Sequence, residues 1–303
     1  MNAHLNLGPV LFNWSADTFR DFYFRMADEA PLETVFLGEV VCSKREPFFA
    51  PELPAIAERL TAAGKKVVFS TLALVMTKRE RDMVQQLCEM DGVIVEANDI
   101  SAVSYLQGRP HTIGPFVNIY NEGSLAVMEK QGATHISLPG ELPRSSLQAL
   151  AKTAKADLEV QAFGRQPLAV SARCYHARSH GLAKDSCQYV CAKDPDGMDL
   201  DTLDGDAFLA VNGIQTMSYT CANLIGELDD LQTIGIHHFR LSPHSCDMVD
   251  VTKTFEAVLK GQMETGEAVE KLNDLMDGLP FSNGYYYGQE GAKAKGMVEE
   301  FGL

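Results

Sequence analysis

Residues 66–97 carry the pattern that decides the fold: "KVVFST" (66–71) is followed by "TKRERDMVQQLCEM" (77–90) and then by "GVIVEA" (92–97). The first and third stretches are short, apolar and rich in β-branched residues, which is typical of buried strands. The middle stretch is amphipathic at helical spacing and begins at Thr77, a residue favoured at the N-cap. Together they predict a strand, a helix and a second strand in a parallel sheet.

The same alternation continues along the chain. Further helices are predicted to begin after Ser15 and after Asn98 or Asp99. Six more stretches resemble strands: "LGPVLFN" (7–13), "TVFLGEV" (34–40), "GPFVNIY" (114–120), "HISLPG" (135–140), "LEVQAFG" (158–164) and "IHHFRLS" (236–242). Eight strands that alternate with helices predict an α/β fold with a closed (β/α)₈ TIM-like barrel, and an open doubly wound sheet is the alternative.

The domain organisation follows from where this regularity fails. We predict one barrel-like domain over residues 1–303, with an insertion at 165–235 that carries the three clustered cysteines Cys174, Cys187 and Cys191 and a short hairpin near "AFLAVNGIQTMS" (207–218). Residues 265–303 read as a C-terminal helical tail that ends with "FSNGYYYGQEG" (281–291).

Composition limits the possible partners and the location. The chain has 26 Lys and Arg against 41 Asp and Glu, which gives a net charge of -15 and repels nucleic-acid phosphates. No apolar run is long enough for a membrane span, and the start "MNAHLNLGPVLFNW" lacks the basic segment of a signal peptide. We therefore expect a cytoplasmic protein that binds no nucleic acid.

The stretch "SARCYHARSHGLAKDSCQYVC" (171–191) holds Cys174, Cys187 and Cys191 at the spacing C-x12-C-x3-C. Cytosolic thiols stay reduced, so such a group favours metal or redox chemistry over disulfides. A closed zinc site and a [4Fe-4S] cluster both require four ligands. The cysteine spacing does not distinguish between them.

The fourth ligand has several candidates: Cys42, Cys88, Cys221, Cys246, His176 and His180. Cys88 lies in an amphipathic helical pattern, where a buried thiol is the simpler interpretation. Cys42 directly follows a predicted strand, and the carboxyl ends of barrel strands all open on one face. The insertion follows the seventh strand and opens on that same face, so geometry pairs it with Cys42.

Several motifs along nearly the whole chain resemble the UbiV branch of the collagenase-like peptidase family. They are "LGPVLFNW", "FLGEVVCSKR", "STLALV", "EANDI", "QPLAVSARCYHARS", "KDSCQYVC", "NGIQTMS", "RLSP" and the late "NGYYY". The resemblance implies a barrel-like catalytic domain and a [4Fe-4S] cluster held by Cys42, Cys174, Cys187 and Cys191. It also implies a heterodimer with a UbiU-like partner that hydroxylates the aromatic ring of a prenylated ubiquinone precursor without O₂, with prephenate as the oxygen donor.

The family name suggests proteolysis, but the sequence contains neither a G-x-S-x-G elbow nor an H-E-x-x-H helix. We therefore expect a hydroxylase subunit and not a peptidase. Two alternatives stay open. The chain could be a cluster-bearing scaffold or electron carrier for a catalytic partner, or it could hydroxylate RNA bases as relatives in the wider family do, which the net charge disfavours.

Candidate catalytic residues are Glu39, Arg173 and Arg178. The two arginines flank Cys174, and guanidinium groups there fit a dicarboxylate donor such as prephenate, unless they only offset cluster charge or form surface pairs. Glu39 ends the second predicted strand and points either into the barrel mouth or to a structural ion pair. The run Tyr285–Tyr287 either lines a groove for the prenyl chain or packs the tail.

Overall fold

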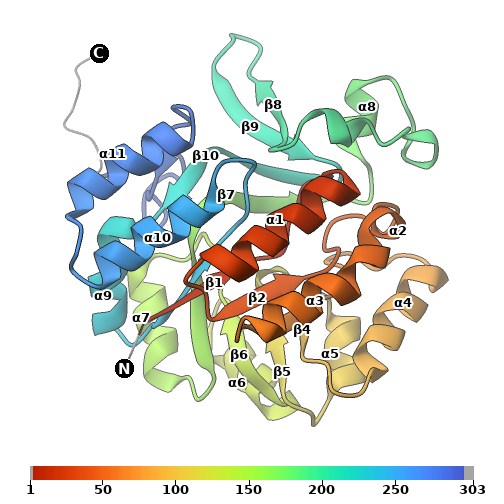
Figure 1. Cartoon of the computed structure of the whole chain (residues 1–303), viewed down its shortest axis with the longest axis horizontal. Coiled ribbons are helices and arrows are strands. Elements are labelled where there is room, and N and C mark those ends of the chain that lie inside the picture. Colours follow the sequence, from red (N-terminus) through yellow and green to blue (C-terminus); the bar gives the residue numbers. More distant parts are fainter. Residues whose placement is uncertain (1–2, 297–303) are drawn as a thin grey trace.

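The computed structural model of the chain describes residues 3–296. Eight parallel strands form a closed barrel, because β1 pairs with β2 on one side and with β11 on the other, and β11 pairs with β7 (Figure 1). The barrel strands are β1 (His4–Leu7), β2 (Thr34–Leu37), β3 (Lys66–Ser70), β4 (Val95–Ala97), β5 (His111–Ile113), β6 (Ala133–Ser137), β7 (Asp157–Val170) and β11 (His238–Leu241). The predicted TIM-like barrel is thus confirmed, and the open sheet is excluded.

Helices surround the barrel, and their starts follow the predicted caps. Ser15 and Asp99 each accept a backbone hydrogen bond at the start of a helix, and Thr77 forms a full capping box with Glu80. The helices are α1 (Ala16–Glu29), α2 (Glu46–Phe49), α3 (Leu53–Ala62), α4 (Lys78–Glu89), α5 (Ile100–Leu106), α6 (Glu122–Gln131), α7 (Arg144–Thr153), α8 (Tyr175–Ser179), α9 (Leu228–Thr233), α10 (Met248–Leu259) and α11 (Thr265–Leu275).

Two strand predictions are displaced by prolines. The first strand was expected at 7–13, but it ends at Leu7, because Pro9 has no N–H to donate to a neighbouring strand. The apolar residues 10–12, which suggested a longer strand, are buried in the loop that follows β1 at the carboxyl end of the strand. The fifth strand was expected at 114–120 and lies instead at 111–113, since Pro115 begins a 3₁₀ turn, η2 (Pro115–Val117).

The sheet continues beyond the barrel. The second half of β7 pairs antiparallel with β10 (Gln215–Asn223), and β10 pairs with β9 (Ala207–Asn212) through a tight turn at Gly213 and Ile214, the predicted hairpin. β8 (Met198–Asp201) adds to β9, and β12 (Phe281–Ser282) returns from the tail to pair with β10. Residues 297–303 of the predicted tail lie outside the described residues.

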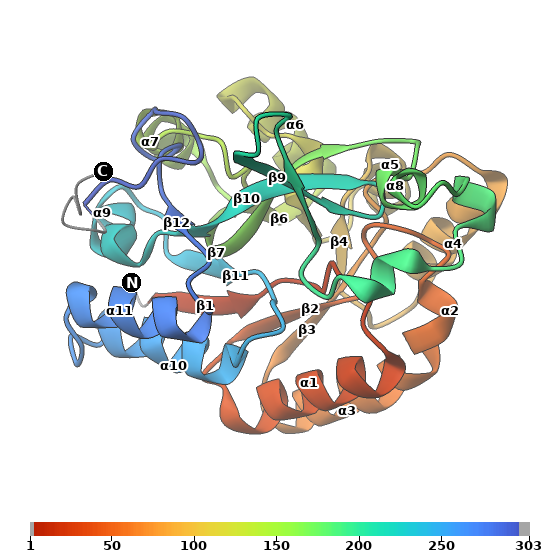
Figure 2. The same cartoon turned by 90° about the horizontal axis from the view of Figure 1, so that it is seen from above.

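The cysteine-bearing segment lies at the carboxyl ends of the barrel strands. Figure 2 shows α8 on the side toward which the arrows of β1 and β2 point, close to α2, which follows the loop after β2. The 3₁₀ turns η3 (Lys184–Ser186) and η4 (Val190–Lys193) complete this segment. Loops at this face of a TIM barrel build the functional site.

The barrel interior is polar along part of its axis. Arg240 on β11 forms ion pairs with Glu96 on β4 at 2.6 Å and with Glu159 on β7 at 2.5 Å, and both carboxylates are fully buried. Asn6 on β1 donates to Glu159, and Ser70 on β3 donates to Glu96. Of these bonds, the pair between Arg240 and Glu96 joins strands on opposite sides of the barrel. No helix among residues 3–296 is long and apolar enough to cross a bilayer.

Candidate metal centre

The four cysteines implied by the resemblance line one small pocket. Cys42 follows β2, Cys174 is the N-cap of α8, Cys187 follows η3 and Cys191 lies within η4. Cys174 and Cys191 are buried, while Cys42 and Cys187 are half-buried. The structure therefore brings together a residue from the second strand's loop and three from a segment more than 130 positions later.

Glu39 holds the loop that carries Cys42. Its Oε1 atom accepts hydrogen bonds from the backbone N–H of Val41 at 2.7 Å and of Cys42 at 2.8 Å. Glu39 is 8% exposed and forms no ion pair among the described residues, so the expected structural ion pair is not observed. Farther along, Ser43 donates to Glu80 at the start of α4, which fixes the other side of the loop.

Two of the sulfur atoms accept hydrogen bonds. The backbone N–H of Ala177 donates to Cys174 Sγ at 3.4 Å, and Asn13 Nδ2 donates to Cys191 Sγ at 3.3 Å. A donor placed on a sulfur favours its charged thiolate form and helps to set the properties of a metal bound there. Asn13 comes from the loop after β1, so a third barrel loop contributes to the centre.

Arg45 lies against the pocket and is only 2% exposed. Its Nη1 donates to the carbonyl of Leu11 and its Nη2 to Asn212 Oδ1, each at 2.9 Å. The buried Nε has no hydrogen-bond partner, and no carboxylate in residues 3–296 pairs with the guanidinium. A buried cation is costly without compensating negative charge, which the nearby Glu39 carboxylate and the neighbouring sulfur atoms can supply.

The ionisation of these groups agrees with this interpretation. Burial raises the pKa of the Cys42 and Cys174 thiols, and the nearby Arg45 partly opposes that effect. For Arg45 itself, burial lowers the pKa, but Glu39, Cys191 and Cys42 outweigh it and leave the value above the usual one. The pocket thus pairs a fixed positive charge with thiols that burial alone would keep neutral.

The donor set fits an iron–sulfur cluster. Four cysteines from two loops line one pocket, and a [4Fe-4S] cluster is usually held by four thiolates. The buried Arg45 beside them offsets the negative charge that such thiolates carry. Four thiolates also match the donor set of a structural zinc site, so metal analysis distinguishes the two.

The other candidate ligands lie elsewhere. Cys88 is buried in α4 as predicted, Cys221 is buried in β10, and Cys246 follows β11. His176 is fully buried, but its Nε2 bonds Asp194 at 2.8 Å, so it fixes the insertion from within. His180 is exposed and stacks on His176.

Arg173 and Arg178 are exposed and line an open groove that also includes Cys174 and Lys184. Their guanidinium groups form no ion pair or hydrogen bond within residues 3–296. Lys44 has a different role, since its Nζ donates to the carbonyl of Lys184 at 2.7 Å and ties the two cysteine loops together. The arginines therefore present unpaired positive charge directly outside the cysteine pocket.

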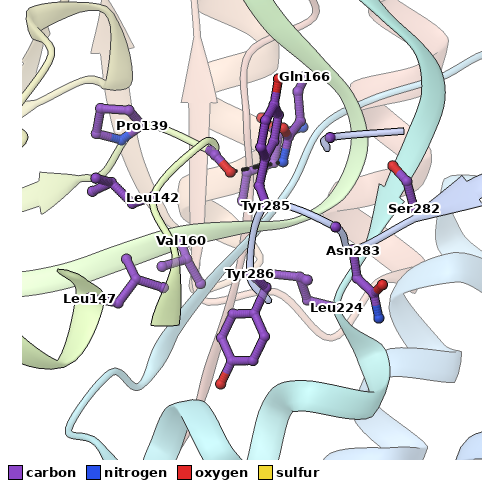
Figure 3. A pocket seen from close by; sticks show the side chains of 14 residues that line it. Pro139, Leu142, Leu147, Val160, Gln166, Leu224, Ser282, Asn283, Tyr285 and Tyr286 are labelled. Atoms are coloured by element: carbon purple, nitrogen blue, oxygen red, sulfur yellow. Dashed lines mark hydrogen bonds between the residues drawn. The ribbon is translucent and has the colours of Figure 1, made fainter. Parts of the chain in front are cut away.

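The tyrosine run packs the tail against the barrel. Figure 3 shows Tyr285 beside Gln166 over a narrow cavity, while Tyr286 points away from it. Tyr286 is 4% exposed and donates to Asp230 on α9, and Tyr287 donates to Glu227 at 3.0 Å. The cavity measures about 20 Å³, which leaves no space for a prenyl chain.

Sequence reasoning placed Arg45 among the cations near the cysteines but did not predict its burial, and it assigned no role to the network of Glu96, Glu159 and Arg240. A charged residue within an apolar strand, as in "GVIVEA" and "IHHFRLS", was the available signal for the network. Sequence reasoning also missed a group of side chains toward the amino ends of the strands. The nitrogen and oxygen atoms of His135, Asp157 and His238 that could bind a metal lie within 4.8 Å of one another. His135 additionally faces Glu159, with 3.4 Å between Nε2 and Oε2.

Comparisons with known proteins identify the family of the chain. Structural alignments include the tryptophan synthase complex of Pyrococcus furiosus, at 12% identity and a TM-score of 0.41, covering 92% of this chain and 99% of that one. DAHP synthase of Thermotoga maritima aligns at 11% identity and a TM-score of 0.44, covering 93% of this chain and 71% of that one. The model of Peptidase family U32 matches residues 14–296, and the chain belongs to this family.

Proposed function

We propose that this chain is a subunit of an iron–sulfur, O₂-independent hydroxylase of the UbiV type. It would act on the aromatic ring of ubiquinone precursors, together with a UbiU-like partner and with prephenate as the oxygen donor. Membership of the U32 family and the UbiV-like motifs support this assignment. The observation that carries it is the pocket that four cysteines line together with the buried Arg45, which forms no ion pair with a carboxylate within residues 3–296.

Cys42, Cys174, Cys187 and Cys191 would hold a [4Fe-4S] cluster, which supplies electron transfer when bound. Glu39 orients the Cys42 loop through two backbone hydrogen bonds, and Asn13 and the N–H of Ala177 donate to ligand sulfurs. These donors and Arg45 stabilise negative charge on the ligand sulfurs.

Arg173 and Arg178 are the residues we assign to the oxygen donor. Both line a groove of about 530 Å³ outside the cysteine pocket, and Lys184 lines it with them. Three cations on a chain of net charge -15 attract a dicarboxylate, and guanidinium forks bind carboxylates in a bidentate way. Substituting both arginines with Gln should raise the KM for prephenate more than it lowers kcat.

The decisive experiment is anaerobic purification followed by iron and sulfide analysis. Wild type should be brown, with about four irons per chain, and Cys42→Ala should lose most of the iron. Cys88→Ala is the matched control, since Cys88 is also a buried thiol but lies in α4, outside the pocket. A colourless zinc protein under strict anaerobiosis would refute the proposal.

The scaffold alternative makes a different prediction about substrate binding. If the chain only carries a cluster for its partner, a prenylated phenol should be retained by the isolated partner and not by this chain. Retention by this chain, alone or in the heterodimer, supports a direct role in hydroxylation.

RNA binding at low salt would instead favour base hydroxylation, which the charge of -15 opposes.

A further inference from the structure

The helical layer of the barrel leaves the outer face of β3 partly uncovered. On β2, the outward side chains of Val35 and Leu37 are fully buried. On β3, the outward side chains of Val67 and Phe69 are only half-buried, although the inward Ser70 is 3% exposed. Outward residues of parallel barrel strands are normally covered by helices, so this strand lacks part of its cover.

The cause lies in how the neighbouring helices pair. α3 packs against α1, and α4 packs against α5, so the two pairs are separated over β3 (Figure 1). A cavity of about 480 Å³ lies between them, a size typical of small-molecule sites. We call this cavity the α3–α4 slot.

The lining of the slot changes in character along its length. Met83, Leu87 and Met90 line it from α4 at intervals of four and three residues, which places them along one face of the helix. Phe69 and Leu53 line the opposite walls. An extended apolar molecule would find sulfur and hydrocarbon contacts along this whole part of the slot.

Polar groups gather where the slot reaches the carboxyl end of β2. Glu39, Ser70 and Thr71 line this end and are all buried. The hydroxyl of Ser70 is already bonded to Glu96, and that of Thr71 accepts from the backbone N–H of Asn98. Glu39 uses only Oε1 for the Cys42 loop, and its Oε2 has no partner within residues 3–296.

We propose that the α3–α4 slot binds the prenylated phenol, with the apolar chain along Met83, Leu87 and Phe69 and the phenol hydroxyl donating to Glu39 Oε2. This inference rests on the proposed function for the identity of the ligand. The second carboxylate oxygen is accessible from the slot and can accept from a hydroxyl, and the apolar walls match an isoprenoid chain. The arrangement puts the ring next to the residue that positions the Cys42 loop.

The test uses 2-geranylphenol as the probe, titrated into the anaerobically purified chain by calorimetry. Wild type should bind it at least tenfold more tightly than phenol, because the chain adds apolar burial. Leu87→Trp fills the slot and should weaken binding at least tenfold. Met90→Trp narrows the slot from a position that is 55% exposed and should also weaken binding, which covers the case in which Leu87→Trp fails to fold.

The matched control is Val127→Trp, which places the same side chain at an exposed apolar position on α6, outside the slot. It should keep the affinity for 2-geranylphenol within twofold. The hydroxyl contact is tested with geranylbenzene, which lacks the donor and should bind at least fivefold more weakly than 2-geranylphenol. Glu39→Gln should remove most of that difference while still accepting the two backbone N–H groups through its amide oxygen.

The site is refuted if wild type does not distinguish 2-geranylphenol from phenol, or if neither α4 variant changes the affinity. It is also refuted if the α4 variants abolish association with a UbiU-like partner and leave 2-geranylphenol binding intact, because the slot is then a protein interface. Iron content of the chain and hydroxylation by its complex with a UbiU-like partner are measured in parallel. Binding of 2-geranylphenol without hydroxylation by the complex contradicts the proposed function and leaves the site standing, whereas hydroxylation by complexes of the variants at the wild-type KM contradicts the site alone.

Discussion

The substitution Arg240→Met tests the ion-pair network inside the barrel. In the native chain, this guanidinium separates two carboxylates, Glu96 and Glu159, that have no exposed surface. Methionine fills a similar volume but leaves both carboxylates without their cation. Removing one partner of a buried ion pair typically costs about 3–5 kcal/mol, because the remaining charge is buried without compensation.

The size of the effect can be worked out from the length of the chain. An unfolding entropy of about 2.1 cal/mol/K per residue over 303 residues is roughly 0.6 kcal/mol/K, so we expect the melting temperature to fall by about 5–8 °C. The assay is circular dichroism melting at neutral pH under anaerobic conditions. Arg25→Met is the control, because Arg25 pairs with Glu29 and Asp247 at an exposed site and should cost under about 1 kcal/mol.

The same variant has a distinctive pH dependence. Although burial raises the pKa of Glu159, Arg240 together with His135 and Asn6 holds it well below its usual value of 4.5. Because the pKa of Glu159 is lowered in the folded chain, its ionised carboxylate stabilises the folded state at pH values above 4.5. This contribution to the free energy of unfolding is lost as the pH falls below 4.5. The difference in melting temperature between wild type and Arg240→Met should therefore become smaller at acid pH. A melting temperature within 2 °C of wild type at neutral pH, or a difference that widens on acidification, would refute this reasoning.

Three further predictions concern the metal centre and the tail. Gly213→Ala should lower the free energy of unfolding by about 1 kcal/mol, because the backbone at this position has a positive φ of 63°. It should also lower iron content, because a Cβ there would lie 2.5 Å from Arg45 Nη2. The control is Gly64→Ala, at φ 79° with open space around it, which should lose stability in denaturant unfolding but keep its iron. Arg45→Met should change the stability of the iron-free chain by less than about 2 kcal/mol but speed cluster loss at least tenfold, followed by visible absorbance. Tyr286→Phe should cost about 1 kcal/mol through the lost bond to Asp230 and leave iron content unchanged, whereas loss of iron would show that the tail supports the metal centre.

The barrel was predictable from the sequence because its signal is repeated. Each strand stretch is short and apolar, each following helix has a cap, and eight repeats together favour closure. The position of Cys42 beside the insertion was also predictable, because the order of the strands alone places Cys42 and the insertion at the carboxyl ends of the barrel strands. The ends of the strands were harder to predict from the sequence. Pro9 and Pro115 lack an N–H and therefore end the strand pairing, although the hydrophobic stretch continues beyond each of them.

Arg45 shows why the remainder of the site could not be predicted. Nothing in "VVCSKREPFF" marks one of its cations as buried, and Lys44, its neighbour, is half-buried and bonded to the insertion. Arg45 is buried because Leu11 and Asn212, which are 201 positions apart, both accept from it. Such a site depends on contacts between distant segments, which no local pattern records.

Glu39 connects the cysteine pocket with the α3–α4 slot, and this has a thermodynamic consequence. One carboxylate oxygen fixes the backbone of Cys42, and the other is the proposed acceptor for a ligand in the slot. A ligand that shifts this carboxylate must also shift the Cys42 loop, so ligand binding and metal binding are coupled. Linkage makes the coupling reciprocal: if the metal changes the affinity for 2-geranylphenol by a given factor, 2-geranylphenol changes the affinity for the metal by the same factor. Titrations with and without iron therefore measure how strongly the binding of 2-geranylphenol and the binding of iron are linked through Glu39.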